Sequence, residues 1–175
     1  VAGDRDQVSE FAKENNVTLF TALMSAYEIL LHRYCQQDDI VIGVPLAGRN
    51  QPDLQGVVGY FVNPVPIRSN IEDDPSVADF IEVNREQISG AIENQQYPLT
   101  RIVDSLKVTR DPGRSPLFQV AFSMERVPGI DEQGIAVFMI GTVGHTFHVG
   151  DLSMETVDIT TRQGQFEVTL VVEEA

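Results

Sequence analysis

The sequence is poor in cysteine, in basic residues and in histidine, and each shortage argues against a class of function. Lys and Arg total 12 against 26 Asp and Glu, which gives a formal net charge of −14. Because nucleic acids and anionic membranes are bound largely through Lys and Arg, we expect neither kind of partner. The single Cys35 cannot form an internal disulfide, and its place in an apolar helical pattern predicts a buried, inert thiol.

Long hydrophobic runs are also missing from the sequence. Residues 1–7 are polar and lack the apolar core of a signal peptide, and no later run reaches the length of a membrane span. We therefore expect a cytoplasmic protein. The chain starts without Met and ends on a strand-like stretch, 171–175, so we also expect it to be a piece of a longer protein.

Helical and strand-like patterns alternate along the 175 residues, of which 42% are hydrophobic, enough to bury the core of one domain or lobe. Apolar residues three and four positions apart predict helices at 4–15, 18–34, 74–93 and 98–106. Apolar, β-branched runs predict strands at 39–44, 58–67 and 117–122, with 154–160 and 165–172 as a terminal pair. The stretch 127–150 stays open between strand and helix turn. This pattern predicts an α/β sandwich.

The segment 18–34 has the most regular helical pattern. Thr18 is its candidate N-cap, and we expect it to bury an apolar face against a sheet: Leu19, Leu23, Ala26, Tyr27, Leu30 and Tyr34. Asp74 followed by Pro75 is the candidate start of the helix that ends at Glu93.

No group of residues makes a catalytic or metal site by itself. His32 lies inside the long predicted helix, where a partly exposed structural role is expected, while His145 and His148 lie close to Asp151. Without Cys or Glu at ligand spacing they are poor zinc ligands, and we expect no metal. Nucleophile, phosphate-loop and dinucleotide-binding motifs are absent. The acidic groups at 38–39 and 72–74 fit capping or solvation better than acid–base catalysis.

Two arginine-bearing loops border predicted strands. The segment 43–49 leaves a buried strand and presents Arg49, whose guanidinium could pair with a carboxylate from elsewhere. The segment 109–116 places Arg110 and Asp111 in a turn before another strand. From the residues alone, a solvated arginine and a local salt-bridged turn are the simpler interpretations.

Taken in order, four segments resemble the later motifs of nonribosomal peptide synthetase condensation domains. The segment 38–49 (DDIVIGVPLAGR) is similar to the run into the fourth motif, and 59–68 (GYFVNPVPIR) to the fifth, with Pro where Thr is common. The segment 95–99 (QQYPL) matches the sixth, although Asn94 replaces the customary leading His, and 110–120 (RDPGRSPLFQV) matches the seventh. We call these the four motif segments. Their order and coverage identify the chain as a member of this family by resemblance.

The resemblance implies a fold like that of chloramphenicol acetyltransferase, with a mixed sheet and packed helices, in which two lobes form a V around a tunnel. Residues 1–175 would be the C-terminal lobe. The implied reaction forms an amide bond between substrates that arrive on the phosphopantetheine arms of donor and acceptor carrier proteins, with no tightly bound cofactor and with an adenylation domain as neighbour. The family's H-H-x-x-x-D-G motif belongs to the N-terminal lobe and does not occur here, so the resemblance implies no catalytic residue and a lobe that is inactive alone.

Site residues follow from the resemblance position by position. Arg49 matches the Arg that pairs with the motif Asp of the N-terminal lobe, and without that lobe we expect it to be exposed or otherwise paired. Asn63, Arg110 and Asp111 match supporting positions near the tunnel or the core. The stretch 127–150 is expected to contribute to a loop that crosses between lobes, and exposed apolar surface, with self-association, is expected where the other lobe would pack.

Two alternatives stay open. One is an epimerization domain of the same superfamily, which the ending 116–120 and the pair Arg110–Asp111 disfavour. The other is a noncatalytic lobe that only docks carrier proteins. Because carrier proteins are usually acidic, a docking patch on this acidic chain should gather Lys and Arg or be apolar.

Overall fold

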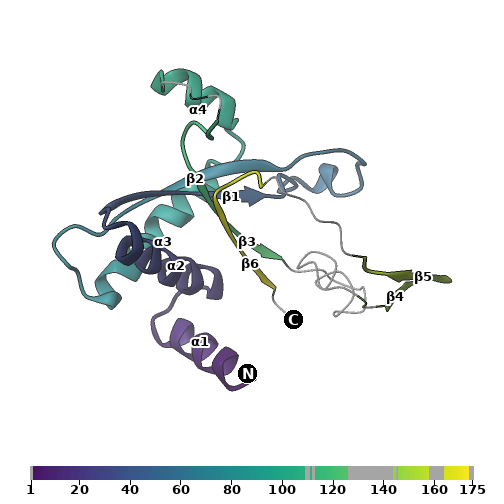
Figure 1. Cartoon of the computed structure of the whole chain (residues 1–175), viewed down its shortest axis with the longest axis horizontal. Coiled ribbons are helices and arrows are strands. Elements are labelled where there is room, and N and C mark those ends of the chain that lie inside the picture. The colour runs from purple at the N-terminus through teal and green to yellow at the C-terminus, as the bar shows by residue number, and fades with distance from the viewer. Residues whose placement is uncertain are drawn as a thin grey trace.

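In the computed structural model, helices pack on a β-sheet (Figure 1), and residues 2–108, 111, 113–125, 144, 146–157 and 164–173 are described. The helices are α1 (Ala2–Glu14), α2 (Leu19–Cys35), α3 (Val77–Glu93) and α4 (Leu99–Leu106), with a short 3-10 helix, η1 (Pro52–Leu54). The strands are β1 (Asp39–Leu46), β2 (Asn63–Asn70), β3 (Val120–Glu125), β4 (Thr146–Val149), β5 (Leu152–Glu155) and β6 (Val168–Glu173). This arrangement confirms the α/β class.

The main sheet has the strand order β2-β1-β3-β6. β1 and β2 are antiparallel, from Asp39 opposite Asn70 to Leu46 opposite Asn63. β3 lies parallel to β1, and β6 lies parallel to β3, so the sheet is mixed. The last two strands were predicted to pair with each other, which is wrong, because β5 pairs with β4 in a separate hairpin that lies apart from the main sheet (Figure 1).

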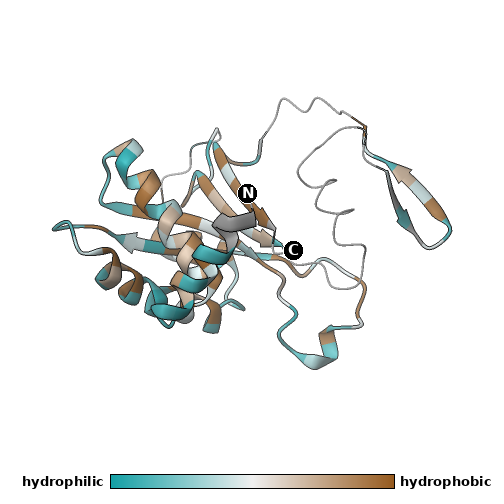
Figure 2. Cartoon of the chain, turned by 90° about the horizontal axis from the view of Figure 1, so that it is seen from below, coloured by the Kyte–Doolittle hydropathy of each residue, from teal (hydrophilic) through white to brown (hydrophobic). Residues whose placement is uncertain are grey.

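The core lies between the sheet and the two long helices, α2 and α3. Apolar side chains of α2 (Met24, Tyr27), β1 (Ile42, Val44) and β3 (Phe122) form one buried cluster. The rings of Phe20 and Phe122 meet edge to face at 5.2 Å between centroids. Figure 2 shows hydrophobic residues along the strands and polar residues on much of the helix surface. Burial of this cluster fixes α2 and α3 on the sheet.

The buried face of α2 differs from the predicted one. Six residues of α2 are buried: Thr21, Ala22, Met24, Ser25, Tyr27 and Glu28. Of the predicted stripe only Tyr27 is fully buried, whereas Ala26 is exposed, Leu30 is 50% exposed and Tyr34 is 83% exposed, so the prediction is wrong at three of its six positions. The helix can bury polar Ser25 and Glu28 because α3 supplies Asn84 as their hydrogen-bond partner. Cys35, predicted to be buried, is exposed because it is the last residue of α2, beyond the packed turns.

The predicted and observed boundaries of the elements differ clearly where loops adjoin strands. β2 begins at Asn63 rather than at 58, and β3 begins at Val120 rather than at 117. α3 begins after Ser76, whose Oγ accepts a hydrogen bond from Asp79 N at 3.2 Å, so the prediction of Asp74 as its cap is wrong. Asp74 instead has a φ of 47° and follows the turn at residues 72 and 73. The predicted N-cap Thr18 is confirmed, since its Oγ1 accepts a hydrogen bond from Thr21 N at 3.1 Å.

Part of the predicted chain lies outside the described residues. This holds for Arg110, for His145, for 158–160 and for most of 127–150, of which residues 144 and 146–150 are described. Across the helices that the structure describes, none is long and apolar enough to cross a bilayer.

Candidate functional site

Arg49 follows β1 and is held inside its own loop. Its Nη1 donates hydrogen bonds to the carbonyl oxygens of Leu54 (2.5 Å) and Val57 (2.7 Å), and its Nη2 donates to that of Gly59 (3.1 Å). The guanidinium also lies 4.5 Å from the centre of the Phe61 ring. A planar, always charged fork can satisfy several carbonyls while it stacks on a ring. Arg49 therefore closes the loop between the fourth and fifth motif segments.

Gly48 sets the direction in which Arg49 leaves β1. Its φ is +66°, a left-handed conformation that favours glycine. A Cβ at this position would overlap the carbonyl oxygen of Phe61. The close approach of Gly48 to Phe61 thus places the neighbouring arginine over the Phe61 ring.

Asn63, the first residue of β2, joins the strand to the sixth motif segment. Its Nδ2 donates hydrogen bonds to the carbonyl oxygens of Gln95 (2.8 Å) and Tyr97 (3.1 Å). Its Oδ1 accepts a hydrogen bond from Leu99 N at 3.4 Å, at the start of α4. A single amide side chain therefore fixes the turn that leads into α4.

We expect Asn63→Ala to lower the free energy of unfolding by about 2 kcal/mol, because three hydrogen bonds are lost and two carbonyls lose their donor. Urea unfolding measures this change. Asn70→Ala, at the exposed far end of β2, is the matched control and should cost less than about 0.5 kcal/mol. Equal losses in the two variants would contradict a special role for Asn63.

The seventh motif segment packs against the fourth through Phe118 and Gly43. Phe118 is 1% exposed, and its ring fills the space where a side chain on Gly43 would lie. The same ring also lies against that of Phe166, with 5.4 Å between centroids. The four motif segments, far apart in the sequence, are thus joined pairwise through Arg49, Asn63 and Phe118.

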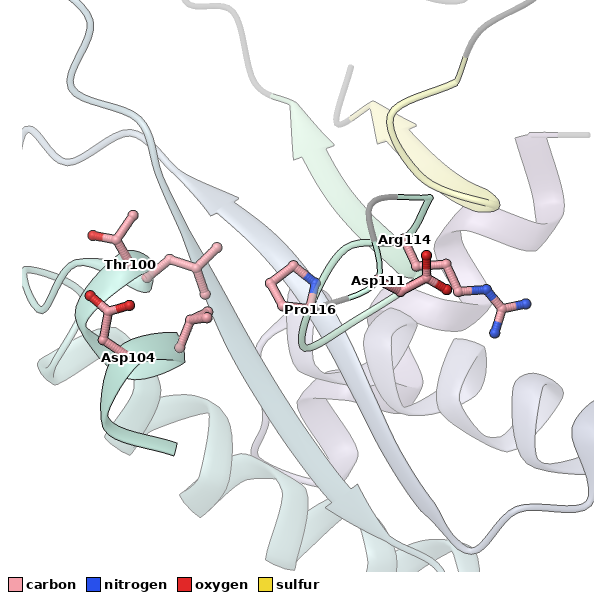
Figure 3. A pocket seen from close by; sticks show the side chains of 7 residues that line it. Thr100, Asp104, Asp111, Arg114 and Pro116 are labelled. Carbon is pink, nitrogen blue, oxygen red and sulfur yellow. The ribbon is translucent and has the colours of Figure 1, made fainter. Parts of the chain in front are cut away.

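A cavity of about 650 Å³ lies between α4 and the turn 111–116. It is lined by Leu99, Thr100, Val103, Asp104, Asp111, Arg114 and Pro116. Figure 3 shows Thr100 and Asp104 projecting from α4 on one side, and Pro116, Asp111 and Arg114 from the turn on the other. Because its lining mixes apolar side chains with charged ones, the cavity suits a molecule that has both apolar and polar parts.

Asp111 and Arg114 also hold the turn itself. Gly113 N donates a hydrogen bond to Asp111 Oδ1 at 2.8 Å, and Arg114 N donates to Asp111 O at 3.1 Å. Arg114 Nε lies 3.4 Å from Glu167 Oε1. The turn is thus held locally by Asp111, as expected, but its ion pair reaches Glu167 outside the turn rather than joining two residues within it.

The described histidines stand apart from these contacts. His32, near the end of α2, has Nδ1 3.0 Å from Gln37 O and 3.5 Å from Asp38 Oδ1, which confirms a partly exposed structural position. His148 lies exposed in β4, opposite Ser153. The described residues contain no group of three or more His, Cys, Asp or Glu that could hold a metal ion.

Residues 2–175 match the family model described as Condensation domain. The chain belongs to the condensation-domain family. Surfactin synthase subunit 2 of Bacillus subtilis (strain 168) is 39% identical over 154 residues, which cover 87% of this chain and 4% of that protein. Surfactin synthase subunit 1 of the same strain is 34% identical over 173 residues, which cover 99% of this chain and 4% of that protein. The chain thus spans about 4% of the length of these relatives.

Solved structures give the same family. A four-domain nonribosomal peptide synthetase, holo-AB3403 bound to AMP and glycine, superposes with a TM-score of 0.83 at 28% identity, over 96% of this chain and 13% of that one. The X-domain from teicoplanin biosynthesis superposes with a TM-score of 0.66 at 25% identity, over 70% of this chain and 27% of that one. The resemblance inferred from the motif segments and the chloramphenicol acetyltransferase-like fold class are confirmed.

Sequence reasoning missed the partners that hold the site together. Three contacts join residues that are distant in sequence or lie in loops. They are the hydrogen bonds of Arg49 to backbone carbonyls, the packing of Phe118 on Gly43, and the hydrogen bonds of Asn63 to the 95–99 segment. The contact between Phe118 and Gly43 did have a signal in the sequence, because a glycine inside a β-branched strand often marks close approach by another group.

Proposed function

We propose that this chain is the C-terminal lobe of a nonribosomal peptide synthetase condensation domain. With an N-terminal lobe it would join a carrier-bound donor acyl or peptidyl thioester to the amine of a carrier-bound acceptor. The observation that carries the proposal is the joining of the four motif segments by Arg49, Asn63 and Phe118 beside a cavity. Loops held this firmly can present a substrate in a fixed position.

In this proposal the catalytic base comes from the other lobe. Neither described histidine, His32 or His148, lies among the residues that line the cavity or contact Arg49 and Asn63. The sequence has no H-H-x-x-x-D-G motif, whose second His would assist attack of the amine on the thioester. The chain alone is therefore expected to be inactive.

Two exposed apolar features are the surfaces that we assign to contact with the N-terminal lobe. The loop after η1 exposes Val58 completely and Tyr60 to 86%. The β4–β5 hairpin exposes Leu152 and Met154, and a two-stranded hairpin is marginally stable without a partner. Apolar groups left in water at such positions favour association with another surface.

The partners follow from the family. Donor and acceptor carrier proteins would bring their substrates on phosphopantetheine arms, and an adenylation domain would lie beside the condensation domain in a cytoplasmic synthetase. We assign the cavity between α4 and the turn 111–116 to the acceptor side, which the resemblance gives to this lobe, and its mixed lining can take both the apolar and the polar parts of a carrier-bound substrate. The lobe itself would hold no tightly bound cofactor.

The test is mass-spectrometric detection of amide product on loaded donor and acceptor carrier proteins. We expect no product from this chain alone and product after a separately expressed N-terminal lobe is added. Product from the chain alone would contradict the proposal that the base lies elsewhere.

The same assay separates the alternatives. An epimerization lobe would change the stereochemistry of a carrier-bound residue after lobe addition and form no amide. A docking lobe would bind carrier proteins in gel filtration while amide and epimer both stay absent. Either result would overturn the proposed reaction and leave the family assignment intact.

A further inference from the structure

Glu28 is a carboxyl group buried completely in the middle of α2. Its exposed fraction is 0%, and the polar side chains around it are nearly as buried: Ser25 at 0%, Ser69 at 4% and Asn84 at 1%. An acid at such a position is costly to bury as an ion unless a positive charge or several donors compensate it. The neighbours of Glu28 therefore determine whether its carboxyl is protonated or ionised.

The hydrogen bonds around Glu28 come from α3. Asn84 Nδ2 donates to Glu28 Oε2 and also contacts Ser25 Oγ at 2.8 Å, so one amide of α3 meets two residues of α2. Within the described residues, Glu28 Oε1 has no hydrogen-bond partner. One hydrogen bond from Asn84 compensates an ionised carboxylate poorly, whereas protonation removes the charge that needs compensation.

Burial raises the pKa of the Glu28 carboxyl from 4.5 to about 7, against the lowering effect of the Asn84 hydrogen bond and of the nearby Ser69 hydroxyl. The single arginine of β2 and the single arginine of α3 are engaged elsewhere. Arg68 of β2 pairs with Asp39 of β1, and Arg85 of α3 pairs with Glu82.

Tyr27, the neighbour of Glu28 on α2, is also buried, which raises the pKa of its hydroxyl above 10 and keeps it neutral. Among the residues described, the groups that surround Glu28 thus supply hydrogen bonds and no compensating positive charge.

The cluster is linked to the candidate site through α3. Asn84 lies in the middle of this helix, which ends at Glu93, and the sixth motif segment follows it directly. That segment is the one whose carbonyls Asn63 binds. A shift of α3 on α2 would therefore move the turn that leads into α4 and the cavity.

We propose that Glu28, in its protonated form, is a positioning residue that holds α3 on α2 through Asn84 and so sets the place of the 95–99 segment. Ionisation of Glu28 draws water to the carboxylate and loosens α3. A cavity of about 310 Å³ between β2 and α3, lined in part by Ser69 and Asn84 and by exposed Arg68, Asn70 and Gln87, provides the route for that water.

The sign of the pH dependence follows from linkage. Between the unfolded pKa of 4.5 and the folded pKa of about 7, the folded chain binds a proton that the unfolded chain has lost. Stability is therefore fully present below the unfolded pKa and is lost as the pH rises through the folded pKa. Between pH 5 and pH 8.5 we expect the unfolding equilibrium constant to rise by on the order of a hundredfold from this group.

The first test uses the chain alone. Urea unfolding and amide hydrogen exchange are compared at pH 5, 7 and 8.5 for the wild type, for Glu28→Gln, which mimics the protonated carboxyl, and for Glu86→Gln, an exposed acid on α3. In the wild type and in Glu86→Gln, protection of residues 77–99 should fall with pH relative to β1. In Glu28→Gln this selective fall should vanish. A fall that persists in Glu28→Gln would overturn the proposal.

A second measurement needs no variant. Carbon NMR of the glutamate side chains in the wild type follows the Glu28 carboxyl directly, with its signal assigned through bonded backbone nuclei. A midpoint near 7 supports the proposal, and a midpoint below 5 would overturn it even if Glu28→Gln failed to fold.

A third readout rests on the proposed function. In the joined domain, amide formation should fall above pH 7 in the wild type, in kcat more than in KM, while Glu28→Gln keeps its rate and Glu28→Ala loses activity at every pH. If the joined lobes make no amide at all, the proposed function fails, whereas the exchange and NMR results still decide the role of Glu28.

Discussion

Gly43→Ala should destabilise the chain by about 3 kcal/mol, the largest loss that we expect from the addition of one methyl group. The new Cβ would overlap the ring of Phe118, which is 1% exposed and already packed against Phe166. Overpacking a filled core costs about 1–3 kcal/mol, and displacing a buried aromatic ring costs more. Urea unfolding measures the change, and hydrogen exchange should show β3 and the 113–119 segment losing protection with it.

Gly90→Ala is the matched control for this substitution. Gly90 lies inside α3 and a Cβ there would meet nothing within 4 Å, so alanine should stabilise the chain by up to about 1 kcal/mol. Combining Gly43→Ala with Phe118→Leu tests the contact itself. Because leucine makes room for the methyl group, the double variant should lose less stability than the two single losses added together. Additive losses would show that Gly43 and Phe118 do not interact.

Local sequence patterns correctly predicted the helices and strands in which apolar residues recur at regular spacing. The helix at 18–34 and the helix at 98–106 appear within one residue of their predicted bounds, and β1 begins at Asp39 as expected. Each has a regular apolar period or a recognisable cap, which depend on neighbours in the sequence. Such signals carry no information about which strands pair, so the predicted terminal pair was wrong and β5 and β6 lie in different sheets.

Contacts between distant residues limited the prediction of the site. The start of β2 was placed too early because 58–62 is apolar, although Val58 and Tyr60 face water and Phe61 packs on Arg49 rather than in the core. Arg49 was singled out from its loop position and received its role from the resemblance, whereas its carbonyl partners depend on a left-handed Gly48 that no pattern in the sequence located.

The face of α2 shows the same limit in the core. Hydrophobicity placed Leu30 and Tyr34 inside and gave no reason to bury Glu28. The burial of Glu28 depends on Asn84, which is 56 positions away in the sequence. A polar residue in a helix is buried when another element brings a partner for it, and this requires knowledge of the packing.

Arg49→Ala should lower the rate of amide formation in the joined domain by on the order of a hundredfold or more. In the proposed function Arg49 pairs with the motif Asp of the N-terminal lobe, and removing one partner of a buried ion pair costs about 3–5 kcal/mol. The change also removes three carbonyl contacts and the stacking on Phe61. In the chain alone, hydrogen exchange should show faster exchange in residues 51–59.

Arg49→Lys separates charge from shape. A lysine keeps the positive charge but offers no planar fork for several acceptors, so its rate should fall between those of the wild type and Arg49→Ala. Arg68→Ala is the matched arginine control, because Arg68 pairs with Asp39 in water at the other end of the β1–β2 pair and should leave the rate nearly unchanged. Equal rates in Arg49→Ala and Arg68→Ala would remove Arg49 from the interface between lobes. A full rate in Arg49→Lys would instead show that charge alone is sufficient there.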